Sequence, residues 1–208
     1  SMKLWHSAAS PFVRKCMIFA HEAGIADQIE LLDAAAHPIN RDARIVETNP
    51  LGKVPTLLLD DGHVIFDSCV ICAYLDEQHD GPKLIPEATD DDPMKRYNAL
   101  VTESLGNGMM DAAVLWRYEQ GVRPEDKQWD QWIEGQKEKV VSSLDYLEHW
   151  KPARLQDIHV GSIAVASALG YLDFRQPQFD WRSGHPVLTQ MFETFSKRQS
   201  MILTQPSG

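Results

Sequence analysis

The sequence predicts a chain of two domains, an α/β domain followed by an all-α helical bundle. Up to residue 79, short apolar runs alternate with segments of helical periodicity in the order β-α-β-α-β-β-α. This order describes a mixed four-stranded sheet with helices packed on it. From Asp90 onward, helical patterns follow one another and no convincing strand is found. We therefore expect the α/β domain at 2–79, a linker at 80–89 and the helical domain at 90–208.

The elements of the first domain are delimited by residues that start or end secondary structure. Asp61-Gly62 separates two apolar runs, which is a strong signal for a β-hairpin. Gly24 stands where the C-terminus of a helix favours a left-handed residue. The expected strands are 3–6, 29–32, 56–60 and 63–66, and the expected helices are 11–23, 41–47 and 68–78.

The second half of the chain reads as four helices after a linker that is broken by Gly81, Pro82 and Pro86. Gly106 and Gly108 are costly inside a helix, and they indicate either a kink or a close approach of another element. The expected helices are 93–120, 128–150, 162–174 and 187–197.

Composition and charge exclude several classes of function. The chain has 208 residues and a formal net charge of −10, and so acidic a surface disfavours nucleic acid and anionic membranes. No apolar run approaches the roughly 20 residues that span a bilayer. Three cysteines, an odd number, argue against a disulfide framework and fit thiols kept reduced. We expect a soluble, cytoplasmic protein without a nucleic-acid or membrane partner.

Ser10 and Pro11 open the first predicted helix directly after the first strand. Serine is a favoured N-cap and proline is favoured at the first helical position, so a purely structural interpretation is available. In the functional interpretation, the strand delivers a hydroxyl to a helix N-terminus. Unpaired N–H groups and the helix dipole favour an anion there, and a thiolate is such an anion.

Two further segments are candidates for a binding site. Pro55 cannot donate to a sheet ladder, so it belongs at the start or edge of a strand, and the Val54-Pro55 bond is a candidate for the cis form. A fixed turn here would leave backbone groups free for a peptide-like ligand, although an ordinary turn explains the residues as well. Asp67-Ser68 begins the third helix, where one residue caps it and the pair offers a carboxylate and a hydroxyl.

These motifs resemble glutathione transferases, particularly bacterial ones. The resemblance rests on Ser-Pro-Phe-Val-Arg-Lys at 10–15, Asn-Pro-Leu-Gly-Lys-Val-Pro-Thr-Leu at 49–57, Asp-Ser at 67–68 and Ala-Leu-Gly-Tyr-Leu-Asp-Phe-Arg at 168–175. It covers nearly the whole chain, and four motifs in the right order are specific. It implies a thioredoxin-like first domain that binds glutathione and a helical domain that holds an electrophilic substrate. It also implies a homodimer. We expect no metal, because a metal site would need further paired ligands and none has suitable spacing.

The resemblance assigns roles to matching residues. Ser10 would donate a hydrogen bond to the glutathione sulfur. Val54 would pair through its backbone with the cysteinyl part of glutathione, beside a cis Pro55. Asp67 and Ser68 would hold the γ-glutamyl end. Phe12 belongs to the implied glutathione site, and Lys53 and His37 would reach the glycyl carboxylate.

Two features depart from this picture or compete with it. The core helix of the family usually opens with a capping box, whereas this chain has His159 and Ser162 there, and we expect His159 to be a poor cap, with a local start at Gly161 or Ser162. Cys69 and Cys72 form a C-x-x-C in the third helix, which we interpret as structural because redox proteins of this fold carry the motif at the first helix. Cys16 reads as a small core residue.

Three functions therefore compete. The first is an enzyme that activates the glutathione thiolate for attack on an electrophile, or that uses glutathione in isomerisation, peroxide reduction or dehalogenation. The second is a binding module that keeps the fold without catalysis. The third is a thiol-disulfide oxidoreductase, against which the serine at position 10 counts.

Overall fold

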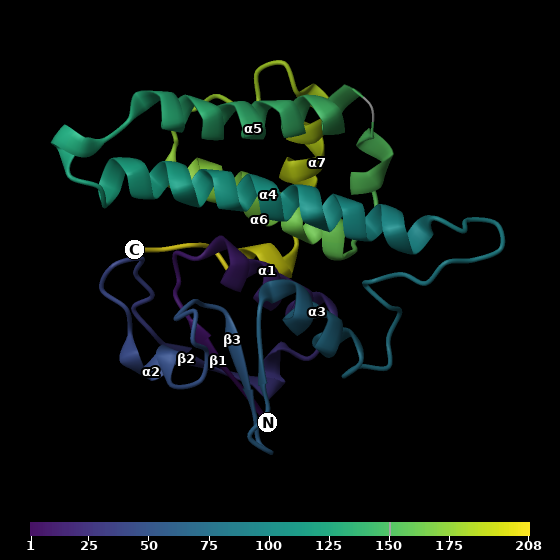
Figure 1. Cartoon of the computed structure of the whole chain (residues 1–208). Helices are drawn as coiled ribbons and strands as arrows, with labels where there is room; N and C mark the ends of the chain where they lie inside the picture. Colours follow the sequence, from purple (N-terminus) through teal and green to yellow (C-terminus); the bar gives the residue numbers. More distant parts are fainter. Residues whose placement is uncertain (150) are drawn as a thin grey trace. The chain divides into compact units, whose positions relative to one another are not determined.

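The computed structural model describes residues 1–149 and 151–208, whose contacts divide the chain into two units. The first unit is Ser1–Pro86 together with Gln199–Gly208, and the second is Glu87–Arg198. Trp150, which the sequence analysis places at the end of a helix, lies outside the described residues. Figure 1 shows the strands in the first unit and the long helices in the second.

The first unit is built on a mixed four-stranded sheet of order β2-β1-β3-β4. β1 pairs with β2 in parallel and with β3 in antiparallel, and β3 pairs with β4 in antiparallel. This confirms the predicted α/β domain with its hairpin. The elements are β1 (Met2–His6), α1 (Pro11–Glu22), β2 (Ile29–Asp33), α2 (Ala43–Val46), β3 (Thr56–Leu59), β4 (Val64–Ile65) and α3 (Ser68–Asp76), with a short 3₁₀ turn at Ala26–Gln28.

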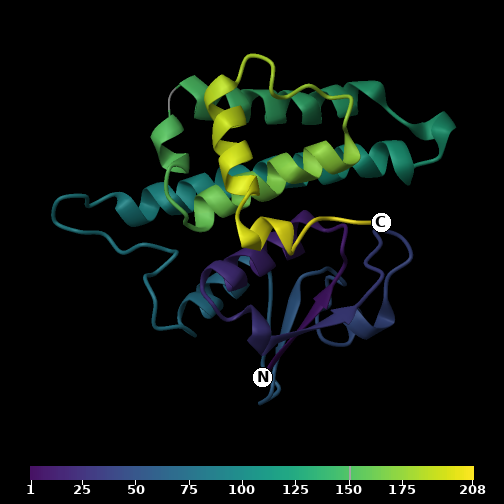
Figure 2. The same ribbon diagram turned by 180° about the vertical axis from the view of Figure 1, so that it is seen from behind.

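The core of this unit lies between the sheet and the α1–α3 pair. Leu4 of β1 and Leu57 of β3 are buried, as are Ile18 of α1 and Ile71 of α3. α1 and α3 pack against each other, and α3 contacts β3. In both views α2 lies away from the α1–α3 pair (Figures 1 and 2). This layering fixes where α1 and α3 begin relative to the strands that precede them.

The first unit extends beyond the expected start of the linker because Asp76 holds the segment after α3. Its buried carboxylate accepts from the backbone N–H of Leu84 at 3.0 Å and of Ile85 at 2.9 Å. Nε2 of His79 lies 2.8 Å from the same carboxylate. Leu84 and Ile85 are buried. The sequence predicts a linker from residue 80, whereas the compact unit continues to Pro86.

The C-terminal segment also joins the first unit, whereas the sequence predicts it as part of the helical domain. It forms α8 (Gln199–Ile202), which runs beside α1 in both views (Figures 1 and 2). Arg14 of α1 donates to the carbonyl of Met201 at 3.0 Å and to Thr204 Oγ1 at 3.2 Å. Burial lowers the pKa of Arg14 to about 10. Farther along, the N–H of Ser207 donates to the carbonyl of Ala8 at 3.1 Å.

The second unit is helical. Each of the four expected helices is present within about two residues of its predicted ends, apart from the end at Trp150. Every residue of the core helix from Val160 to Leu172 is buried. None of the helices among the described residues combines the length and apolar character that crossing a bilayer requires. The helices are α4 (Lys95–Gly121), α5 (Asp130–His149), α6 (Val160–Arg175) and α7 (Pro186–Ser196), with 3₁₀ turns at Glu125–Lys127 and Pro152–Leu155.

α4 and α6 approach each other closely at a glycine. A Cβ added to Gly106 would lie 2.7 Å from both the carbonyl carbon and the Cβ of Ala164, which is closer than real contacts allow. A Cβ added to Gly108 would meet nothing within 4 Å. The expected close approach is therefore present at Gly106 but not at Gly108.

The start of α6 corrects the expectation for His159. His159 is the N-cap, its Nδ1 accepts from the N–H groups of Gly161 at 3.0 Å and Ser162 at 3.3 Å, and Nε2 lies 2.7 Å from the carbonyl of Arg154. Ser162 Oγ accepts from the backbone N–H of His159 at 3.0 Å, which completes a capping box. The expectation was wrong because a neutral imidazole with a free ring nitrogen accepts hydrogen bonds as a cap oxygen does.

Candidate functional site

The register of the sheet brings the predicted site segments to one end of it. β1 ends at His6, which pairs with Asp33 at the end of the parallel strand β2. Trp5 pairs with Thr56, so antiparallel β3 begins at that same end. β4 runs antiparallel to β3 and finishes there too. The loops after β1, β2 and β4 and the turn before β3 therefore gather at one sheet end.

Ser10 stands at this end as the N-cap of α1. Its Oγ accepts from the backbone N–H of Val13 at 3.2 Å, and Pro11 occupies the first turn of the helix. The side chain is half-buried. A serine hydroxyl accepts through its lone pairs and donates through its hydrogen, so capping α1 leaves that hydrogen for a ligand. The structural and functional interpretations of Ser10 are thus compatible.

Ser7, a second hydroxyl in the loop after β1, stabilises the turn that leads to Ser10. Its carbonyl accepts from the N–H of Ser10 at 3.1 Å, and its Oγ lies 3.4 Å from the N–H of Ala9. Phe12 follows in the first turn of α1 and is half-buried. The loop therefore presents two hydroxyls, of which only that of Ser10 caps the helix.

The turn before β3 has the cis Val54–Pro55 bond that the sequence analysis puts forward. It is held from within by Asn49, whose Oδ1 accepts from the N–H of Leu51 at 2.9 Å and whose Nδ2 donates to Thr56 Oγ1 at 3.0 Å. Thr56 Oγ1 in turn donates to the carbonyl of Lys53 at 2.8 Å. Asn49 and Thr56 are almost fully buried.

Sequence reasoning did not assign this framework role to Asn49 and Thr56. The available signal was a pair of short polar residues flanking a turn rich in proline and glycine. Gly52 in this turn has φ +62°, a conformation that L side chains rarely adopt. The half-buried Val54 and the exposed side chain of Lys53 are thus presented by a turn that internal hydrogen bonds hold.

Asp67 and Ser68 have different roles at the start of α3. Asp67 is the N-cap, and its Oδ1 accepts from the N–H of Cys69 at 3.0 Å. Asp67 is exposed, whereas Ser68 is 2% exposed. The buried ammonium of Lys15 donates to Ser68 Oγ at 3.1 Å. An exposed carboxylate beside a hydroxyl at a helix N-terminus suits a ligand that carries both an ammonium and a carboxylate.

His37 lies in the loop after β2, which ends at α2. Its Nδ1 accepts from the N–H groups of Ile39 at 3.1 Å and Asn40 at 2.9 Å, so only Nε2 is left to interact with a ligand. The loop is closed by Asp42, which accepts from the N–H of Ala35 at 3.2 Å. The Arg44 guanidinium, with which Asp42 is hydrogen-bonded, holds the pKa of that carboxyl below its usual value.

The three cysteines are free thiols. Cys16 and Cys72 are buried, and Cys69 is half-buried with its sulfur 3.7 Å from Lys15 Nζ. Cys69 and Cys72 lie on α3, whereas Ser10 caps the start of α1. Among the residues that the structure describes, no group of three or more histidine, cysteine, aspartate or glutamate side chains is placed to hold a metal ion.

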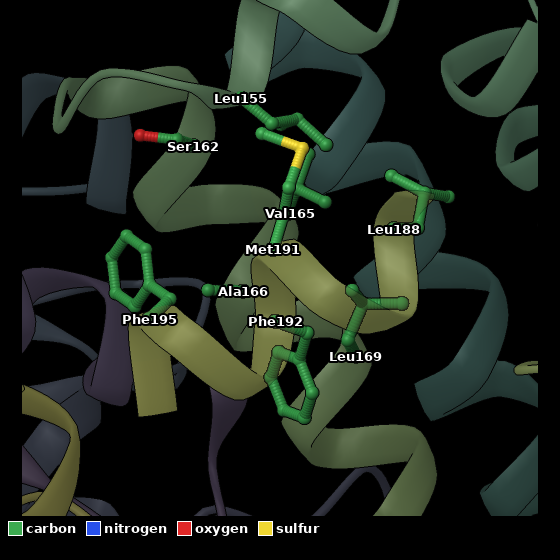
Figure 3. A pocket seen from close by; sticks show the side chains of 9 residues that line it. All are labelled: Leu155, Ser162, Val165, Ala166, Leu169, Leu188, Met191, Phe192 and Phe195. Carbon is green, nitrogen blue, oxygen red and sulfur yellow. The ribbon is translucent and has the colours of Figure 1, made fainter. Parts of the chain in front are cut away.

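A small apolar cavity lies within the helical unit between α6, α7 and the 3₁₀ turn before α6. Figure 3 shows Met191 extending between Leu155 and Val165. The space open to the centre of a water molecule is about 20 Å³. A single water needs roughly 10–15 Å³ of such space, so the cavity is too small for an organic electrophile. Its polar member, Ser162, is already bonded within the capping box. The lining residues are Leu155, Ser162, Val165, Ala166, Leu169, Leu188, Met191, Phe192 and Phe195.

The N-terminal domain model of glutathione S-transferases matches residues 9–78. The uncharacterised GST-like protein YibF of Escherichia coli is 35% identical over 208 residues, which cover 99% of this chain and 98% of YibF. The chain belongs to the glutathione transferase family.

Solved structures agree in fold over the full length. A glutathione transferase family member from Pseudomonas fluorescens Pf-5 with bound glutathione is 42% identical, with complete coverage of both chains and a TM-score of 0.95. A glutathione S-transferase from Methylobacillus flagellatus with glutathione bound is 33% identical, also with complete coverage of both chains, with a TM-score of 0.84. The first unit is thus a thioredoxin-like domain, followed by the helical domain of this family.

Proposed function

We propose that this chain is a glutathione transferase that binds glutathione in its first unit and activates the thiolate for attack on a small electrophile. The observation that carries the proposal is the gathering of the Ser10 loop, the Val54–Pro55 turn and the start of α3 at one sheet end. Relatives of the same fold have been solved with glutathione bound.

Each end of glutathione has a chemical counterpart among these residues. The carboxylate of Asp67 suits the γ-glutamyl ammonium, and the hydroxyl of Ser68 suits its carboxylate. The hydrogen-bonded turn at Val54 offers backbone groups to the cysteinyl part. Lys53 and Nε2 of His37 supply donors for the glycyl carboxylate. The Ser10 hydroxyl, beside Phe12, would then donate to the sulfur.

The magnitudes allow this arrangement to activate the thiol. A free thiol has a pKa of about 8.5, and bringing it near 7 requires roughly 2 kcal/mol of preference for the thiolate. One charge-assisted hydrogen bond from Ser10 would contribute about 1.5–3 kcal/mol. The N-terminus of α1 would add about 0.3–1 kcal/mol. Ser10 donates throughout and does not lose its own proton.

Binding is tested first, by thermal shift with glutathione and with S-methylglutathione at millimolar concentration. Both ligands should raise the unfolding temperature, since a ligand that binds only the folded chain stabilises it. The ultraviolet absorbance of the thiolate should then appear at neutral pH with glutathione but not with the S-methyl compound. Absence of any shift with either ligand would reject the glutathione site.

Turnover with a panel of electrophiles separates the enzyme from a binding module of the same fold. Glutathione binding without turnover of any compound would favour the module. The family also leads us to propose a homodimer that serves in detoxification. Sedimentation at micromolar concentration should then give about twice the chain mass of 23.5 kDa, and a clean monomer would reject the dimer.

A further inference from the structure

Lys15 of α1 is fully buried, which is unusual for a lysine. Its side chain is 0% exposed, in the middle of a helix whose neighbours Cys16 to Ala20 form the core. Removing an ammonium from water is costly unless polar partners replace the solvent. Two of its contacts lead to the start of α3, namely Ser68 Oγ at 3.1 Å and Cys69 Sγ at 3.7 Å. A buried cation is thus directed at a residue of the proposed glutathione site.

The contact determines how Ser68 can interact with a ligand. An ammonium donates hydrogen bonds and accepts none, so Ser68 Oγ is the acceptor in this pair. The single hydrogen of the hydroxyl then points away from Lys15. Ser68 is the first residue of α3, where the helix N-terminus favours an anion. The contact with Lys15 therefore leaves the Ser68 hydroxyl hydrogen to be donated to an anionic group of a ligand.

Arg14, the neighbouring basic residue, shows that burial in α1 alone does not imply a role in the site. Its guanidinium binds the carbonyl of Met201 and the hydroxyl of Thr204, which attaches the C-terminal segment to the unit. Lys15 binds the side chain of Ser68 instead. Arg14 thus holds the C-terminal segment, and Lys15 holds the side chain of Ser68, which is proposed to contact the ligand.

We infer that Lys15 is a positioning residue of the proposed glutathione site, which holds the Ser68 hydroxyl so that it donates to the α-carboxylate of the γ-glutamyl group. The inference rests on the proposed function. It assigns Lys15 to ligand affinity and not to thiolate formation, because the interaction reaches the γ-glutamyl end of the ligand and not the sulfur.

The test compares glutathione with 4-aminobutyryl-cysteinyl-glycine, which lacks only the γ-glutamyl α-carboxylate. Lys15→Met removes the donor at similar length, Lys15→Gln keeps a neutral donor, and Lys83→Met is the matched control. Lys83 is an exposed lysine of the same unit that donates to the carbonyl of Asp76 at 2.6 Å. Dissociation constants for both peptides are measured by calorimetry on each chain, after circular dichroism has shown that it is folded.

Lys15→Met should weaken glutathione binding about tenfold or more, as expected for a hydrogen bond to a charged group. Its affinity for the truncated peptide should stay within about twofold of wild type, and Lys15→Gln should lie in between. Lys15→Met together with Ser68→Ala should weaken glutathione no more than Ser68→Ala alone, since both remove one interaction. The pH dependence of thiolate formation should not move. If Lys15→Met does not fold, Lys15→Gln carries the same comparison.

If the wild-type chain binds glutathione, two results would overturn the inference about Lys15 and leave the proposed function standing. One is an unchanged affinity of the folded Lys15 variants for glutathione, and the other is an equal loss for both peptides. A wild-type chain that binds neither peptide would instead reject the proposed function, and the role of Lys15 with it.

Discussion

The N-termini of α1 and α6 are both capped by a side chain, but the two caps differ in what they leave available. Ser10 accepts one N–H, from Val13, and keeps its hydroxyl hydrogen. His159 accepts two N–H groups at Nδ1, while Nε2 faces the carbonyl of Arg154. The cap in the first unit therefore retains a donor, whereas both nitrogens of the cap in the helical unit are engaged.

The difference teaches how a helix start can serve chemistry or stability. A cap with an unused donor, at an end of the sheet where three other segments gather, can bind an anionic ligand. A cap whose every polar atom is bonded inside the protein can only hold the helix.

Replacing Ser10 should have the largest effect. Ser10→Ala removes one charge-assisted hydrogen bond of about 1.5–3 kcal/mol, so the bound thiolate at neutral pH should fall roughly ten- to hundredfold. Glutathione affinity should change less, because the contacts at its two ends remain. The thiolate absorbance of the bound peptide across pH measures this effect.

Ser7→Ala is the matched control, since Ser7 supplies the second hydroxyl of the loop after β1 and its Oγ accepts from the local N–H of Ala9. It should leave the thiolate absorbance unchanged. The lost cap in Ser10→Ala is expected to cost about 1 kcal/mol, which is checked by denaturant unfolding. If Ser10→Ala keeps both thiolate and turnover while Ser7→Ala loses them, the donor is Ser7 and Ser10 is only a cap.

The packing behind α6 gives the next largest effect. Gly106→Ala should lower the free energy of unfolding by about 1–3 kcal/mol, because the new methyl group would meet the backbone of α6 at 2.7 Å. Gly108→Ala on the same helix meets nothing within 4 Å and should stabilise the chain by up to about 1 kcal/mol. Urea unfolding of the two variants side by side tests the pair, and equal stabilities would refute the close contact.

The fold was largely predictable because its signals are local. The Asp61-Gly62 turn predicted the hairpin, and apolar periodicity predicted the long helices to within about two residues. α8 was missed because four residues carry too little periodicity. The C-terminal segment belongs to the first unit through contacts such as that of Arg14 with Met201, which join residues far apart in the sequence. No pattern within either segment indicates it.

Protonation of His159 should weaken the start of α6 at low pH. Burial lowers the pKa of His159 below its ordinary 6.5. Just below pH 6.5 the unfolded chain therefore binds the proton before the folded chain does, and stability falls as pH falls through this range. The decrease in the free energy of unfolding should approach the contribution of one N-cap, about 1 kcal/mol. Unfolding by urea between pH 8 and pH 5 measures it.

His159→Asn is the control, because asparagine caps well and does not titrate in this range. The difference in unfolding free energy between wild type and His159→Asn isolates the histidine from other titrating groups. It should be flat above pH 7 and decrease below pH 6.5. A difference that stays constant over the whole range would show that the folded chain does not resist protonation of His159.

The candidate site was predictable by segment but not by contact. Proline, glycine and cap residues mark the turns and helix starts that contain Ser10, Val54 and Asp67, and the resemblance to glutathione transferases assigned the roles of these residues. The gathering of their loops follows from strand register, which the hairpin only partly determines. The contact of Lys15 with Ser68 could not be predicted, since a lysine within an apolar run gives no indication of which side chain it reaches.

The smallest effect is expected at α3, whose N-terminus is capped by Asp67 and carries the C-x-x-C. Cys69→Ala with Cys72→Ala should leave glutathione-dependent turnover within about twofold, as for changes outside the reacting groups. Cys72 is fully buried, and the sulfur of Cys69 lies 3.7 Å from Lys15 Nζ. Both cysteines belong to α3, whereas Ser10 caps α1. Replacing the buried Cys72 is expected to lower stability, so turnover is compared at a temperature where both wild type and double variant are folded.

A folded double variant without turnover would move the chemistry from Ser10 to α3 and favour the thiol-disulfide oxidoreductase. The start of α3, and not that of α1, would then be the helix start that serves chemistry. Turnover that survives here but is lost in Ser10→Ala would place the reacting sulfur on the ligand and not on the protein.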